Sequence, residues 1–181
     1  MHMNAALLDG GDEFSGYTVN MKISYDAAQL SSRKVAPICI WIDGRPFPSA
    51  NWTDFLPSIM TAWLENVLAL SASPRLPPPM QNRYQLTFID GPWAVLIDEG
   101  PTKDQVALVA VEKVPASHVS WDIEFQRVAH ETVLRSVLQQ SILDAARGVL
   151  RYCKQEKLHP RVGDVAALEH VLALHDARTP L

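Results

Sequence analysis

Carboxylates are the side chains of this sequence whose type and spacing could support catalysis. Asp90 and Asp98 bracket an expected strand, and Asp43, Glu99 and Asp104 lie at expected turns. Two carboxylates in one cleft can act as acid and base when their surroundings separate their pKa values, and their oxygens suit divalent cations. Aspartate is also a common turn residue, because its side chain caps backbone amides. We expect turn chemistry to explain these residues, with no catalytic and no metal site.

The sequence lacks other reactive motifs. No serine has glycines two residues to either side, as a nucleophile elbow requires, and the 8 glycines form no phosphate-binding loop. The 6 histidines include no pair at the four-residue spacing of a helical zinc site. Cys39 and Cys153 are too few for a disulfide framework, and we expect them to be buried, reduced thiols. No cofactor is expected.

Charge and composition exclude several function classes. The 181 residues include 16 Lys and Arg against 20 Asp and Glu, a formal net charge of -4, which is the wrong sign for neutralising phosphates. The longest apolar runs, such as Val106 to Val111, fall short of the roughly 20 residues that cross a bilayer. Residues 1–20 lack the pattern of a secretory signal. We expect a cytoplasmic protein that binds neither nucleic acid nor membranes.

Apolar periodicity predicts the elements that position these side chains. Residues 17–25 alternate apolar and polar side chains, which predicts a half-buried strand. Val35 to Ile42 is apolar at almost every position and predicts an inner strand, with pairing that begins only after Pro37 because proline lacks the amide. Residues 54–70 repeat apolar side chains at three and four spacing and predict a helix, capped by Thr53 or Asp54.

The rest of the chain predicts a strand meander followed by helices. The meander covers residues 84–89, 93–98 and 105–114, and residues 122–157 and 164–175 predict two helices. Together these elements predict an α+β fold, with an antiparallel sheet of four or five strands, an early inserted helix and a C-terminal helical layer. We expect residues 1–16 to form a flexible leader, residues 17–181 to form a single domain, and the long helix to lie across one face of the sheet.

Acidic and aromatic residues are concentrated in one section of the chain. Residues 43–112 hold eight acids and four bases, and four of the 5 tryptophans fall there or close to it. Trp41 and Trp63 are expected in the core, whereas Trp52 and Trp93 adjoin turns. Tryptophan beside carboxylates is typical of surfaces that anchor a basic protein partner. We expect a partner-binding surface made of turn residues: Asp43, Arg45, Trp52, Asp90, Trp93, Asp98, Glu99 and Asp104.

Two short segments carry a resemblance to a known class of proteins. The segment from Asn51 to Phe55, which reads Asn-Trp-Thr-Asp-Phe, leads to Trp63 and Leu64, and Phe88 to Trp93 reads Phe-Ile-Asp-Gly-Pro-Trp. Over roughly residues 40–97 the chain resembles small bacterial immunity proteins of polymorphic toxin systems. The resemblance implies an α+β fold without catalytic residues, which neutralises a toxin by covering its active site or substrate groove.

Three functions follow as hypotheses. The first is a non-enzymatic domain that binds a cognate protein, a basic toxin domain, because an acidic protein captures a basic one faster. The second is an enzyme or small-ligand domain with a carboxylate-lined pocket between the sheet and the long helix, using Asp90, Asp98 or His118. The third is an accessory subunit that dimerises through the long helix. The sequence favours the first and leaves the oligomeric state open.

Overall fold

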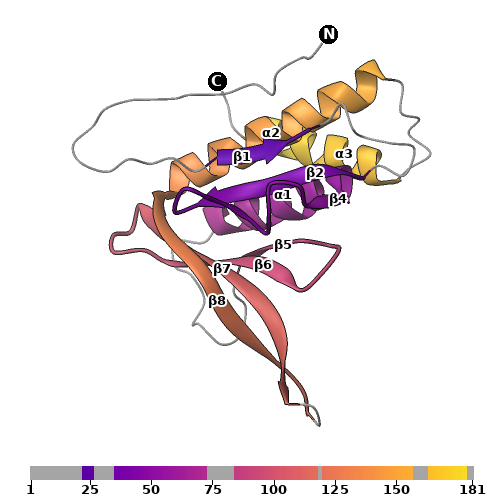
Figure 1. Cartoon of the computed structure of the whole chain (residues 1–181). Coiled ribbons are helices and arrows are strands. Elements are labelled where there is room, and N and C mark those ends of the chain that lie inside the picture. The colour runs from indigo at the N-terminus through magenta and orange to yellow at the C-terminus, as the bar shows by residue number, and fades with distance from the viewer. Residues whose placement is uncertain (1–21, 27–34, 73–83, 118–119, 157–162, 179–181) are drawn as a thin grey trace.

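The computed structural model describes residues 22–26, 35–72, 84–117, 120–156 and 163–178. These residues form two four-stranded antiparallel sheets and three helices (Figure 1). The α+β class is therefore confirmed, with the strands divided between two sheets. The leader expected over residues 1–16 lies outside the described residues.

The first sheet is built around the apolar strand β2 (Val35–Ile42). One edge of β2 pairs with β1 (Lys22–Tyr25), and the other pairs with β3 (Arg45–Phe47) and β4 (Thr53–Phe55). The expectation that pairing begins only after Pro37 is wrong, because Pro37 pairs with Thr53 of β4. The carbonyl of Pro37 accepts a bond from the amide of Asp26, on the β1 side. In a strand, the N–H and the C=O of one residue point toward the same neighbouring strand. The N–H that Pro37 lacks would therefore point toward β1, so its absence leaves the ladder with β4 intact.

The second sheet has the order β5-β6-β7-β8. Its first three strands are β5 (Tyr84–Thr87), β6 (Trp93–Glu99) and β7 (Gln105–Ser117), and each is antiparallel to the next. They confirm the predicted meander. In Figure 1, β7 and β8 extend together well beyond the rest of the sheet.

The prediction of one helix over residues 122–157 is wrong in its first part. Residues up to 134 form the strand β8 (Ser120–Leu134), and the helix α2 (Arg135–Gln155) begins only after it. The register along β8 shifts where Ala110 pairs with Ala129 but Val111 pairs with Arg127, so Val128 is an extra residue. This β-bulge interrupts the two-residue alternation of the strand, and the resulting apolar spacing imitates a helix.

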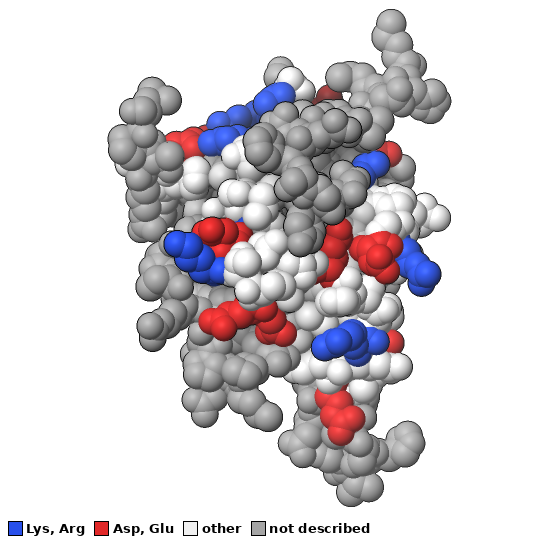
Figure 2. Space-filling model, turned by 90° about the vertical axis from the view of Figure 1, so that its left-hand side faces the viewer, with Lys and Arg blue, Asp and Glu red and all other residues white. Residues whose placement is uncertain are grey.

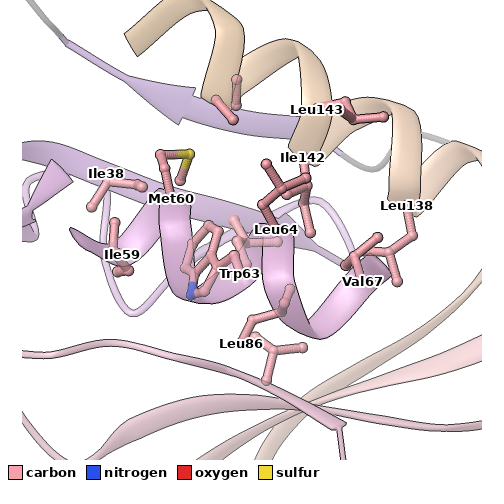
Figure 3. Close-up of a cluster of buried hydrophobic side chains, with 14 of the residues drawn as sticks. Ile38, Ile59, Met60, Trp63, Leu64, Val67, Leu86, Leu138, Ile142 and Leu143 are labelled. Carbon is pink, nitrogen blue, oxygen red and sulfur yellow. The ribbon is translucent and has the colours of Figure 1, made fainter. Parts of the chain in front are cut away.

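Helix α1 (Leu56–Ala72) lies at the centre of the core. One side of α1 faces β5, and Trp63 of α1 and Leu86 of β5 are fully buried there. The other side of α1 packs against Leu138 and Ile142 of α2 (Figure 3). The third helix, α3 (Gly163–Arg178), packs on α1 and α2. The long helix was expected to lie across a sheet face, but α2 packs mainly on α1. The apolar stripe of α2 is therefore buried inside the chain rather than available for dimerisation.

Candidate protein-binding site

The eight residues expected to form one surface fall into two groups near opposite ends of β6, and some of them belong to the first sheet. Consecutive turns of an antiparallel meander alternate between the ends of its strands. The β5–β6 turn with Asp90 and Trp93 is therefore separated by the length of β6 from Glu99 and Asp104. The seven residues of β6 span about 20 Å at about 3.3 Å per residue. The structure does not bring all eight residues together.

Trp52 and Trp93 form the surface end of an aromatic column. Their rings meet edge to face with centroids 6.4 Å apart, and Trp93 meets Phe47 in the same way at 5.7 Å. The column continues inward from Phe47 to Phe88 at 5.8 Å and from Phe88 to Trp63 at 5.3 Å. The outer two rings are half-buried, whereas Trp63 is fully buried and its Nε1 donates to the carbonyl of Thr87. The outer tryptophans are thus held rigidly by the core.

Asp54 fastens the β5–β6 turn to the start of α1. It is the one buried charged residue among those described. Its Oδ2 accepts the amide of Ile89 at 2.8 Å and the amide of Asp90 at 3.3 Å, while Oδ1 accepts the amide of Phe55 at 2.7 Å. The sequence predicted that Thr53 or Asp54 caps the first amides of the helix, but the amides that the Asp54 side chain accepts are those of Phe55, which precedes α1, and of residues 89 and 90. A buried carboxylate that accepts three amides organises structure.

Gly91 allows this turn to approach the tryptophans. Its φ of +115° is a conformation that residues with a side chain rarely adopt. A Cβ placed there would lie 2.8 Å from Cη2 of Trp52 and 3.2 Å from Cδ1 of Trp93. The indole N–H of Trp52 is buried and has no acceptor among the described residues. The Trp52–Trp93 pair is therefore set by close packing.

The other expected residues lie near the opposite end of β6, where the β2–β3 hairpin of the first sheet contacts β8. Asp43 and Gly44 have φ values of 52° and 68°, as a two-residue hairpin turn requires. The amide of Asp43 donates to Oε2 of Glu131 on β8 at 3.1 Å. Burial is the main reason that the pKa of Glu131 is raised; the carboxylate of Asp43 raises it further, and the bond from the Asp43 amide opposes the shift.

The charges at this end do not form a continuous acidic surface. Arg45 of the same hairpin is exposed, as are Glu99 and Asp104. Figure 2 shows the side that lies at the left of Figure 1, where acidic side chains occur in separate small groups with Lys and Arg between them. The carbonyl of Asp104 accepts the amide of Arg135 at 2.8 Å, so this turn also helps to start α2. Turn and capping roles account for the backbone contacts made here.

The sequence did not identify the extension of β7 and β8 that projects beyond the rest of the described sheet (Figure 1). Trp93 of β6 pairs with Glu112 of β7, and this is the last pair between those strands. Beyond it, residues 113–117 of β7 pair only with residues 120–125 of β8. We call this two-stranded extension the ribbon. The alternation of polar and apolar residues over 122–126, which reads Asp-Ile-Glu-Phe-Gln, was the signal for it, and the prediction of a helix over residues 122–157 concealed that signal.

The two faces of the ribbon and its base differ in charge. Paired residues of antiparallel strands lie on the same face, and successive residues alternate. One face, here called the acidic face, continues from Trp93 and consists of Glu112, Val114, Glu124 and Gln126. The other, here called the basic face, consists of Lys113, Phe125 and Arg127. On β8, the side chains of residues 124–128 are all exposed.

No group of three or more metal-binding side chains occurs among the described residues. Burial raises the pKa of both Cys39 and Cys153, which keeps these buried thiols protonated, as expected for core residues.

The second hypothesis expected a pocket between the sheet and the long helix that is lined by Asp90, Asp98 or His118. Asp90 and Asp98 lie toward opposite ends of β6, and α1 occupies the space between α2 and β5. His118 lies outside the described residues.

None of the helices in the described part of the chain combines the length and the apolar character of a membrane crossing. Comparisons with family models, with curated proteins and with solved structures find no match for this chain.

Proposed function

We propose that the chain is a non-enzymatic, cytoplasmic protein-binding domain that neutralises a cognate toxin by covering its active site or substrate groove. The observation that carries the proposal is the ribbon. Two-stranded hairpins are only marginally stable by themselves in water, and this one extends past the last pair with β6. Folding of the core does not require such an extension, whereas insertion into a partner's groove does.

The composition of the ribbon and of the adjoining part of β8 supports a protein partner. Phe125 is 46% exposed and Val128 is 54% exposed, although both are large apolar residues on one strand. They adjoin charged residues of both signs. Apolar side chains rimmed by charge are typical of protein interaction sites. The resemblance to immunity proteins over residues 40–97 and the net charge of -4 support a basic toxin as that partner.

Growth rescue tests the proposal directly. Cells express the product of the gene directly upstream of this one, alone or together with this chain. We expect this chain to restore growth and to form a stoichiometric complex with that product without chemical turnover. Failure of the intact chain both to rescue growth and to bind would contradict the proposed function.

A shortened variant tests the observation that carries the proposal. Residues 115–123 are replaced by Asn-Gly, which joins Val114 to Glu124 through a tight turn. The amide of Lys113 donates to the carbonyl of Pro92, so Lys113 directs its backbone hydrogen bonds away from β8. The next residue, Val114, directs its own toward its partner Glu124, and a two-residue turn requires such a hydrogen-bonded pair. The variant keeps the acidic and the basic face and removes only the outer part of the ribbon. We expect it to rescue growth less well than the intact chain, and full rescue would show that residues 115–123 are dispensable.

A further inference from the structure

We infer that the acidic face of the ribbon is the docking surface, and that it binds a protein surface rich in Lys and Arg. This inference rests on the proposed function and adds to it the face that is used and the chemistry of the partner. It concerns Glu112, Val114, Glu124 and Gln126, together with the adjoining Trp52–Trp93 pair.

Strand alternation separates the charges completely along this part of the sheet. Glu112 pairs with Gln126 and Val114 pairs with Glu124, so both carboxylates lie on one face. Lys113 and Arg127, which alternate with them, lie on the other. Neither Glu112 nor Glu124 forms an ion pair with any described residue. Two like charges that no cation of the described residues pairs with leave a negative potential that a basic partner can neutralise.

The Trp52–Trp93 pair gives the acidic face a rigid aromatic anchor. Trp93 is the neighbour of Glu112 across the β6–β7 ladder and lies on the same face. Contacts with Trp52 and Phe47 fix its ring before any partner arrives. Preorganised tryptophan is a common hot spot at protein interfaces, because little side-chain entropy remains to be lost on binding.

The basic face offers a weaker case. It carries the exposed Phe125 but lacks a tryptophan of the aromatic column, and Lys113 is half-buried, as is Glu112 of the acidic face. Its two cations would suit an acidic protein or a nucleic acid, and binding through that face is therefore the competing outcome of the test.

Charge reversal on matched positions separates these outcomes. The probe is the purified product of the upstream gene, and its dissociation constant is measured at low and at physiological salt. The test variant is Glu112→Lys with Glu124→Lys. The control is Glu99→Lys with Asp104→Lys, which makes the same change in net charge at exposed residues of the other end of β6. A third variant, Lys113→Glu with Arg127→Glu, reverses the basic face. Thermal unfolding verifies that each variant folds, and the corresponding Gln variants replace any that does not.

We expect the acidic-face variant to bind on the order of tenfold more weakly or more slowly, with a reduced dependence on salt. The Glu99 and Asp104 control and the basic-face variant should keep the wild-type affinity or exceed it. Equal weakening by the test variant and its control, or weakening confined to the basic-face variant, would overturn the inference and leave the proposed function in place. If the wild-type chain does not bind the upstream product at all, the proposed function fails as well.

Discussion

The carboxylate of Asp54 accepts the backbone amide of Ile89 at 2.8 Å, across 35 residues of sequence. Through this bond the strand β4, which directly precedes α1, holds the β5–β6 turn in front of Trp93. The position of the aromatic anchor on the acidic face therefore depends on a buried carboxylate that belongs to a different sheet.

Replacing Asp54 should destabilise the protein strongly. Asp54→Ala leaves the amides of Phe55, Ile89 and Asp90 without their acceptor, and we expect a loss of about 3 kcal/mol in the free energy of unfolding. Asp54→Asn keeps one acceptor oxygen and should lose about half as much. The measurement is urea unfolding. Asp90→Asn is the matched control, because the side chain of Asp90 is exposed, and it should leave the midpoint unchanged.

A methyl group at Gly91 should be far more costly than one at Gly44. Both glycines have positive φ, so each alanine variant carries backbone strain, which is about 1–2 kcal/mol at the left-handed φ of 68° and larger at 115°, outside that region. Only at Gly91 would the new Cβ meet a ring, at 2.8 Å from Trp52, whereas nothing lies within 4 Å at Gly44. We expect Gly91→Ala to lose about 2 kcal/mol more than Gly44→Ala. Equal losses, measured by thermal or urea unfolding, would show that the Trp52 contact carries no energy.

The sequence predicted the fold class, the meander and the helix of α1 correctly, because each rests on a local pattern. Alternation or near-continuous apolar character defines β2, β5, β6 and β7, and three-to-four spacing defines α1. The error at β8 has a local cause too. Val128 is the extra residue of a β-bulge. The sheet face that holds residues 125 and 127 therefore continues at residue 130 instead of 129, and the apolar residues follow a helical spacing.

The site was predicted less well, because it depends on contacts that are distant in sequence. Trp52 and Trp93 were identified, yet nothing local shows that they touch or that Asp54 holds the turn beside them. One failure was avoidable. A meander already places the turn with Asp90 at the opposite end of β6 from Glu99 and Asp104, so the eight expected residues could not form one surface.

The contribution of Glu131 to the free energy of unfolding should fall as the pH rises through the pKa that this carboxyl has in the folded protein. Burial raises that pKa above its ordinary value of 4.5, so the folded state holds the proton more tightly than the unfolded chain does. The favourable contribution is therefore fully present below pH 4.5 and is lost once Glu131 ionises in the folded state.

Glu131→Gln should remove this dependence, because the amide side chain stays neutral and its oxygen can still accept the amide of Asp43. We expect the variant to be slightly more stable than the wild type at neutral pH, with the difference disappearing in acid. Urea unfolding of both proteins, from acid below pH 4.5 to neutral pH, measures the effect. The exposed Glu124→Gln is the control and should show no such trend. A wild type that becomes relatively more stable at neutral pH would contradict the expected sign.

Shortening the ribbon should leave the stability of the fold almost unchanged. Where the structure describes the residues that Asn-Gly replaces, in 115–117 and 120–123, their strand pairs lie within the hairpin, and the described core lies among the residues that remain. We expect the free energy of unfolding to change by less than about 1 kcal/mol, because an extended two-stranded hairpin contributes little by itself. Urea unfolding and far-ultraviolet circular dichroism measure the change. A large loss of stability would mean that the ribbon supports the core, and the length of β7 and β8 would then have a structural explanation instead of a functional one.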